Sequence, residues 1–126
     1  MSSYAILFSL IEKMEGNART TRIRETLRVL GGTHNYLGYR HVEMAVLLVL
    51  EDEDRLESVV KDVYMAVADQ CGCNWNAVER NIRTLVHRAW KINAKKIVEM
   101  AGYPMAASPT ASEFIEIVAN YVRRSQ

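Results

Sequence analysis

Apolar side chains recur every three or four residues along most of the chain, and this spacing is typical of helices that bury one face. Strict alternation of apolar and polar residues, the pattern of a half-buried strand, is missing from the sequence. The spacing and the breaker residues predict helices over residues 3–15, 21–30, 39–51, 54–70, 75–91, 95–101 and 111–123. The expected fold class is all-α, a compact bundle of about six to seven helices.

Residues near the ends of the predicted helices support these helix boundaries. Gly31 stops the second helix by supplying backbone that other residues adopt at a cost. Thr110 and Glu113 have the spacing of a capping box, in which each side chain accepts from the other's free backbone N–H. The run 44–50 is apolar nearly all round, so its helix is predicted to be the central buried one.

The 126 residues suit one domain. We expect residues 1–18 to form an extra N-terminal helix and residues 19–126 the domain itself, because neither an internal repeat nor a long linker divides the chain. The 49% hydrophobic and 25% charged fractions are those of a soluble globular protein. Without a long apolar run or a signal peptide, we expect a cytoplasmic protein with no membrane partner.

The formal net charge of +1 hides an uneven distribution. Residues 19–41 hold five arginines and one acid, residues 42–70 hold eight acids and two basic residues, and residues 71–96 hold six basic residues and one acid. Such asymmetry raises the question of a nucleic-acid partner. On charge alone, solvated helix faces explain it equally well.

Residues 64–90 have the small-residue and glycine spacing of a helix-turn-helix. Ala68 is the small residue where two helices cross, and Gly72 supplies a turn that tolerates positive φ. Asn74 is placed to cap the second helix. The internal contacts are predicted to come from Val67, Cys71, Cys73, Val78 and Ile82.

The second of these helices, over residues 75–91, has an apolar and a polar side. Val78, Ile82, Leu85, Val86 and Ala89 fall on the apolar side. The candidate base-reading residues on the polar side are Asn76, Glu79, Arg80, Arg83 and Thr84. The candidate phosphate contacts are Asn74, His87, Lys91, Lys95 and Lys96.

The residue types on this polar side suit base reading. Arginine can donate two hydrogen bonds to guanine, and glutamate can accept from the cytosine amino group. Because an acid repels phosphate, Glu79 is expected either to orient an arginine or to accept from a base. The alternative to a DNA-binding motif is a helical hairpin with a solvated polar face.

Several short motifs then occur in a recognisable order. They are Gly38-Tyr39 with Glu43 and Ala45, Val78-Glu79-Arg80-x-Ile82-Arg83, Ala89-Trp90, Gly102-Tyr103, and Pro109-Thr110-x-Ser112-Glu113-Phe114-Ile115 with Val118-Ala119. Together they cover about residues 21–123. Over this length the chain resembles the C-terminal effector domain of stage zero sporulation protein A, the sporulation response regulator.

The resemblance implies a compact, roughly six-helix fold that binds a short DNA box and can occupy adjacent boxes as a tandem dimer. It also implies that Glu79, Arg80 and Arg83 match the family's recognition residues. Asn76 and Thr84 depart from its pattern, which bears on the identity of the box and not on DNA binding. The family's regulator carries a phosphate-accepting receiver domain, and we expect this chain to work without one.

We therefore expect a sequence-specific transcription regulator whose partners are double-stranded DNA, a second copy of the chain and RNA polymerase. The alternative is a protein-interaction module that modulates a full-length regulator without productive DNA binding. No catalytic triad, paired-carboxylate pocket or glycine-rich phosphate loop is present, so neither an enzyme nor a cofactor is expected. We expect no metal either, with His34 and His41 on the surface and Cys71 and Cys73 packed under the turn.

Overall fold

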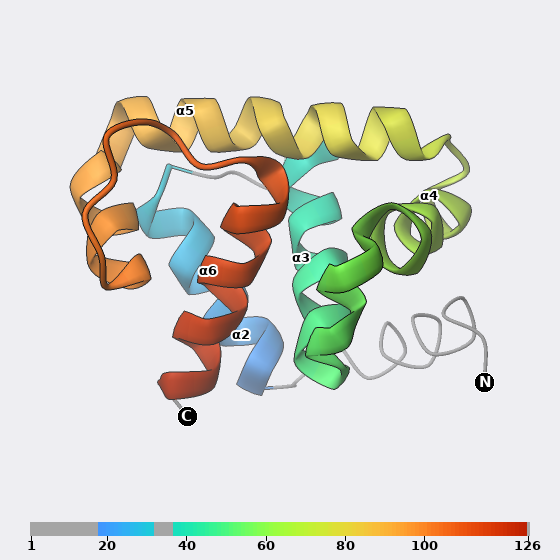
Figure 1. The fold of residues 1–126 in the computed structure, drawn as a ribbon, viewed down its shortest axis with the longest axis horizontal. Helices are drawn as coiled ribbons and strands as arrows, with labels where there is room; N and C mark the ends of the chain where they lie inside the picture. Colours follow the sequence, from blue (N-terminus) through green and yellow to red (C-terminus); the bar gives the residue numbers. More distant parts are fainter. Residues whose placement is uncertain (1–17, 32–36, 126) are drawn as a thin grey trace.

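The computed structural model describes residues 18–31 and 37–125 of the chain, and every regular element in this part is helical. The elements are α2 (Ala18–Val29), α3 (Leu37–Glu51), η1 (Glu53–Ser58), η2 (Val60–Tyr64), α4 (Met65–Cys71), α5 (Trp75–Ala101) and α6 (Ala111–Arg124). The long helix α5 lies across one end of a bundle that contains α2, α3 and α6 (Figure 1). The all-α prediction is confirmed, while the helix predicted over residues 3–15 lies outside the described residues.

The centre of the fold is α3. Every residue from His41 to Leu50 is buried, as the apolar run predicted. This helix packs against both α5 and α6, and Ile23 of α2 and Phe114 of α6 are completely enclosed beside it. Each large apolar side chain buried in this way contributes about 1.5–3 kcal/mol to stability.

The prediction for His41 is wrong. This side chain is 2% exposed, because α3 is enclosed so completely that its position in the helix outweighs its polarity. Its Nδ1 atom has no hydrogen-bond partner among the described residues. Burial lowers the pKa of the imidazole, so His41 is held in its neutral form.

The single helix predicted over residues 54–70 is also wrong. The chain forms a 3₁₀ helix η1, a π-helix η2 and then α4, with Asp52 capping η1 by accepting from the Asp54 N–H at 3.1 Å. Arg55 of η1 and Tyr64 of η2 are both buried. Arg55 Nη1 donates to the Asp62 carbonyl oxygen at 3.1 Å, which connects η1 to η2.

Two helices were predicted where α5 runs, with a gap at residues 92–94. The backbone of α5 is non-helical at Asn93, with φ −153° and ψ 60°, so the break stands where it was predicted. The Asn93 Oδ1 accepts from the Lys96 N–H at 3.2 Å and caps the second half. The Asn93 Nδ2 donates to the Val29 carbonyl oxygen of α2 at 3.5 Å.

Two further local predictions are confirmed. Thr110 Oγ1 accepts from the Glu113 N–H at 3.1 Å and a Glu113 carboxylate oxygen accepts from the Thr110 N–H at 2.9 Å, which completes the capping box of α6. Gly31 has φ +85°, the left-handed conformation expected after α2. The ends of these helices therefore follow from residues close by in the sequence.

Candidate nucleic-acid interface

The turn between α4 and α5 has the geometry of a helix-turn-helix. Gly72 has φ +69° and its N–H donates to the carbonyl oxygen of Ala68, which is 4% exposed. The Cys73 N–H donates to the same oxygen at 3.0 Å. A residue with a Cβ would pay about 1–2 kcal/mol to adopt this left-handed backbone, so glycine at position 72 determines where α4 ends.

Asn74 begins α5 as predicted. Its extended backbone places Oδ1 to accept from the Ala77 N–H at 3.0 Å. This satisfies one of the backbone donors that an α-helix leaves unpaired at its start. Asn74 is exposed, beside the positive end of the helix.

The first half of α5 separates its apolar and polar residues as expected. Val78, Ile82, Leu85, Val86 and Ala89 are all buried. We call the opposite set the recognition stripe: Asn76, Glu79, Arg80, Arg83 and Thr84, of which all but the half-buried Glu79 are exposed. The partly buried Trp75 and Trp90 pack against the core near the two ends of this half.

The two cysteines do not hold the turn as predicted. Cys71 and Cys73 are both exposed, and the Cys71 Sγ lies 3.7 Å from the Sδ of the buried Met44. Val67 and Val78, which are completely buried, hold α4 against α5 instead.

Within the stripe, Arg83 forms an ion pair with a described residue and Arg80 does not. Arg83 Nη1 donates to both carboxylate oxygens of Glu79, each at 3.0 Å, one helical turn away. This pair is partly exposed, so it contributes only about 0.3–0.5 kcal/mol and opens readily. The Arg80 guanidinium makes no ion pair with any described residue, and the Arg80 carbonyl oxygen accepts from the Thr84 hydroxyl at 3.0 Å.

The candidate phosphate contacts differ in how free their side chains are to reach DNA. Asn74, His87, Lys91 and Lys95 are exposed. Lys96 lies beyond the break at Asn93, where its Nζ donates to the Tyr121 hydroxyl of α6 at 3.3 Å and to Glu99 at 3.4 Å. Contact with Tyr121 raises the pKa of Lys96, so its charge is kept but directed toward α6.

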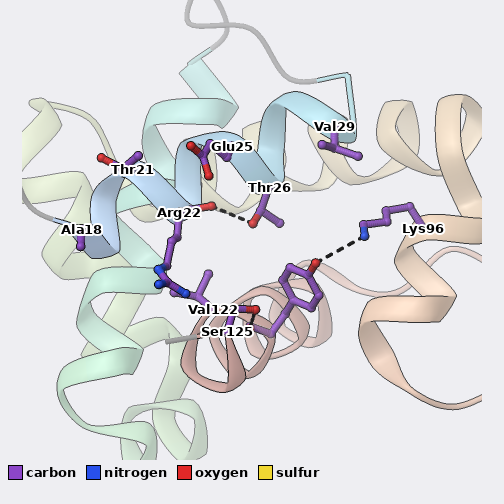
Figure 2. A pocket seen from close by; sticks show the side chains of 10 residues that line it. Ala18, Thr21, Arg22, Glu25, Thr26, Val29, Lys96, Val122 and Ser125 are labelled. Atoms are coloured by element: carbon purple, nitrogen blue, oxygen red, sulfur yellow. Dashed lines mark hydrogen bonds between the residues drawn. The ribbon is translucent and has the colours of Figure 1, made fainter.

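Lys96 also borders an open groove between α2, α6 and the second half of α5, drawn in Figure 2. The groove holds about 620 Å³, within the size range of small-ligand sites. Arg22 and Glu25 of α2 lie across from Val122 and Ser125 of α6 in this view. None of its lining residues belongs to the first half of α5, so this groove is separate from the recognition stripe.

Arg24 of α2 has a structural partner on α3. Its Nε donates to the carboxylate of Glu43 at 2.9 Å, and Glu43 is 2% exposed. Because a buried carboxylate is costly without a partner, Arg24 stabilises α2 against α3. Nearby, burial and the Glu43 charge raise the pKa of Tyr39, whose hydroxyl donates to the Arg24 carbonyl oxygen at 3.4 Å.

Two residues near the interface were missed in the sequence. Arg40 of α3 is exposed and close enough to the turn for its charge to lower the pKa of Cys71. Tyr64 is buried behind Glu79, and burial followed by the Glu79 charge raises its pKa to about 12. The sequence signal for Arg40 was that it is the one arginine or lysine of α3, but only the fold brings that helix close to the turn.

A comparison with models of protein families matches residues 23–122 to the family described as Sporulation initiation factor Spo0A C terminal. The match covers most of the chain and includes all of α3, α4, α5 and the recognition stripe. The chain belongs to this family. The Spo0A C-terminal domains are DNA-binding effector domains and not a family of enzymes.

As a Spo0A C-terminal domain, the chain is a DNA-binding protein. In the part of the chain that the structure describes, no helix is long and apolar enough to cross a membrane. The same part contains no group of three or more His, Cys, Asp and Glu residues that is suited to a metal ion.

Proposed function

We propose that this chain is a sequence-specific, double-stranded DNA-binding transcription regulator that inserts residues 75–91 into the major groove. The observation that carries the proposal is the exposed recognition stripe on the second helix of a helix-turn-helix, in a chain of a DNA-binding family. A helix of this length fits the major groove, where each base pair presents a distinct set of donors and acceptors.

Each stripe residue has a role that its chemistry suits. Arg80, which pairs with no acid among the described residues, donates two hydrogen bonds to the O6 and N7 atoms of one guanine. Arg83 does the same at a neighbouring pair, with Glu79 holding it extended until the bases replace that carboxylate or accept alongside it. Asn76 and Thr84 are shorter and read the flanking positions.

Phosphate contacts would fix the helix in the groove. Asn74 lies at the start of α5, His87 and Lys91 lie along its first half, and Lys95 lies just past the break at Asn93. All four are exposed. They supply affinity and register without reading sequence. The contacts of Lys96 with Tyr121 and Glu99 argue for a structural role at that position rather than a phosphate contact.

The proposal extends to how the chain is controlled. The recognition stripe is already exposed in the described part of the chain, which supports binding without a phosphorylated receiver domain in cis. As the resemblance implies, two copies on adjacent boxes would present two recognition helices at a fixed spacing. Titration of a duplex with one or two boxes, followed by sedimentation, measures this stoichiometry.

The decisive experiment begins with selection of bound sequences from random DNA by the purified chain. Fluorescence anisotropy then compares the selected duplex with a scrambled one at constant salt. The double variant Arg80→Ala/Arg83→Ala should lose at least about 1–3 kcal/mol of binding to the selected duplex. Its affinity for the scrambled duplex should change far less, because that binding is sequence-independent.

A matched control is Arg123→Ala, which removes an exposed arginine of α6 that pairs with Glu53 away from the stripe. It should leave both affinities unchanged. Equal binding of the selected duplex by the double variant and the wild type would refute the assignment. A selection that enriches no sequence at all would favour the protein-interaction module instead.

A further inference from the structure

Two cysteines flank the turn that precedes the recognition helix, and one of them contacts a methionine of α3. Cys71 is the last residue of α4, Cys73 follows the turn at Gly72, and both are exposed. The Cys71 Sγ lies 3.7 Å from the Sδ of Met44, a residue of α3 that is 3% exposed. A buried thioether therefore faces a thiol that solvent can reach.

Three effects shift the pKa of the Cys71 thiol. Burial and the neighbouring Cys73 thiol raise the pKa of Cys71, whereas the charge of Arg40 lowers it. The second cysteine lies two residues along the same turn, and both its thiol and the Arg40 guanidinium act electrostatically on the first thiol. Two thiolates side by side repel each other, and a cation between them relieves that repulsion.

We propose that Cys71, Cys73 and Met44 form a binding site for one soft monovalent d¹⁰ cation, of which Cu(I) and Ag(I) are the representatives. Thiolate and thioether sulfurs are the ligands that such ions prefer. With metal–sulfur bonds of about 2.3 Å, two sulfurs that share one ion in a trigonal plane lie about 4 Å apart. The Cys71–Met44 separation of 3.7 Å is close to that value.

These three sulfur atoms suit neither a zinc site nor a disulfide. Zinc takes four ligands in structural sites, and the described residues offer no third His, Cys, Asp or Glu here. A disulfide between residues only two positions apart would strain the backbone of the turn. A three-coordinate soft cation needs no fourth ligand.

Binding of the cation leaves protons and charge accounted for. The two thiols lose their protons to solvent, and two thiolates with one monovalent cation leave a net charge of −1, which the Arg40 guanidinium offsets. No electron is transferred when the ion is supplied in its monovalent state. The bound ion would connect α3, α4 and the turn, so it should raise the melting temperature of the chain.

The test uses the purified chain without added thiols. Silver(I) is the redox-inert probe, and Cu(I) is supplied anaerobically against a chromophoric chelator. The wild type should bind one ion per chain, and its melting temperature should rise when Ag(I) is added. Cys71→Ser and Cys73→Ser should each lose roughly 10- to 100-fold or more in affinity, and Met44→Leu about 10-fold.

Met100→Leu is the matched control, because Met100 is an equally buried thioether at the far end of α5. Circular dichroism checks that every variant is folded. Unchanged affinity in either serine variant overturns the site, and so does equal affinity in Met44→Leu and Met100→Leu. An ion that links two chains, seen by sedimentation, also overturns it, whereas a loaded monomer supports it. None of these measurements involves DNA, so the result is independent of the proposed function.

Discussion

Glu79 is the one acidic residue of the recognition stripe, and its position beside Arg83 determines how that arginine is presented. The carboxylate accepts from Arg83 Nη1 at both oxygens and is itself half-buried in front of Tyr64. An arginine held in this way loses less side-chain entropy when it meets a base. The same carboxylate repels phosphate, so it weakens binding to any DNA that offers no compensating base contact.

The variant Glu79→Gln separates these two effects. We expect its affinity for a scrambled duplex to rise several-fold, while discrimination between the selected and scrambled duplexes falls roughly tenfold. Anisotropy titrations of both duplexes at the same salt measure the ratio. Glu99→Gln, which changes an acid paired with Lys96 beyond the break in α5, is the control and should leave the ratio unchanged. A constant ratio in Glu79→Gln would show that Glu79 has no part in recognition.

Two adjacent lysines provide a second residue-level comparison. Lys95 is exposed, whereas Lys96 is held by Tyr121 and Glu99. We expect Lys95→Ala to reduce the slope of log affinity against log salt by about 1, the loss of one phosphate contact. Lys96→Ala should leave that slope unchanged and lower the melting temperature instead. The reverse pattern would contradict the orientation of these side chains.

At the scale of elements, the recognition helix is held in position by its contact with α3. A Cβ built on Gly38 would collide with the carbonyl oxygen of Asn81, which is a backbone atom and cannot turn aside. The two helices therefore approach as closely as they do only because residue 38 has no side chain. Leu85 lies at the same contact and is buried beneath the stripe.

Gly38→Ala tests this contact. The added methyl should push α3 and α5 apart and cost about 1–3 kcal/mol of unfolding free energy. Urea denaturation of the variant measures the loss. Leu37→Ala, a change at the exposed neighbouring position, is the control and should cost far less. If Gly38→Ala is as stable as the wild type, the close approach of the two helices is not maintained in solution.

At the scale of the whole molecule, the central helix contains a titratable group that water does not reach. His41 is buried and its pKa is lowered by that burial. Above the ordinary histidine pKa of about 6.5, the imidazole is neutral in both the folded and the unfolded chain. As pH falls through that value, the unfolded chain binds the proton first, so the free energy of unfolding decreases.

We therefore expect urea denaturation to show lower stability at pH 5.5 than at pH 7.5. The variant His41→Leu should show a smaller decrease relative to its own stability at pH 7.5. The exposed His87 provides the control, since His87→Gln should keep the wild-type pH dependence. An undiminished decrease in His41→Leu would assign the acid sensitivity to another group.

Several features of the interface were predictable because they depend on neighbours a few residues away. The left-handed turn at Gly72, the cap at Asn74 and the capping box at Thr110 each involve hydrogen bonds within one helical turn. The buried and exposed sides of α5 follow from its 3.6-residue period in the same way. The ordered family motifs added the DNA-binding family, which periodicity alone does not identify.

The sequence by itself therefore determined α2, α3, α5 and α6, the caps at Asn74 and Thr110, and the residues that share the polar side of α5. The tertiary structure alone decided that His41 is enclosed, that the chain after Asp52 winds first tightly and then widely, and that Lys96 faces α6. The physical reason is the distance along the chain over which each interaction acts. Backbone hydrogen bonds and helical periodicity act over about four residues, whereas burial and ion pairs depend on whichever distant elements pack alongside.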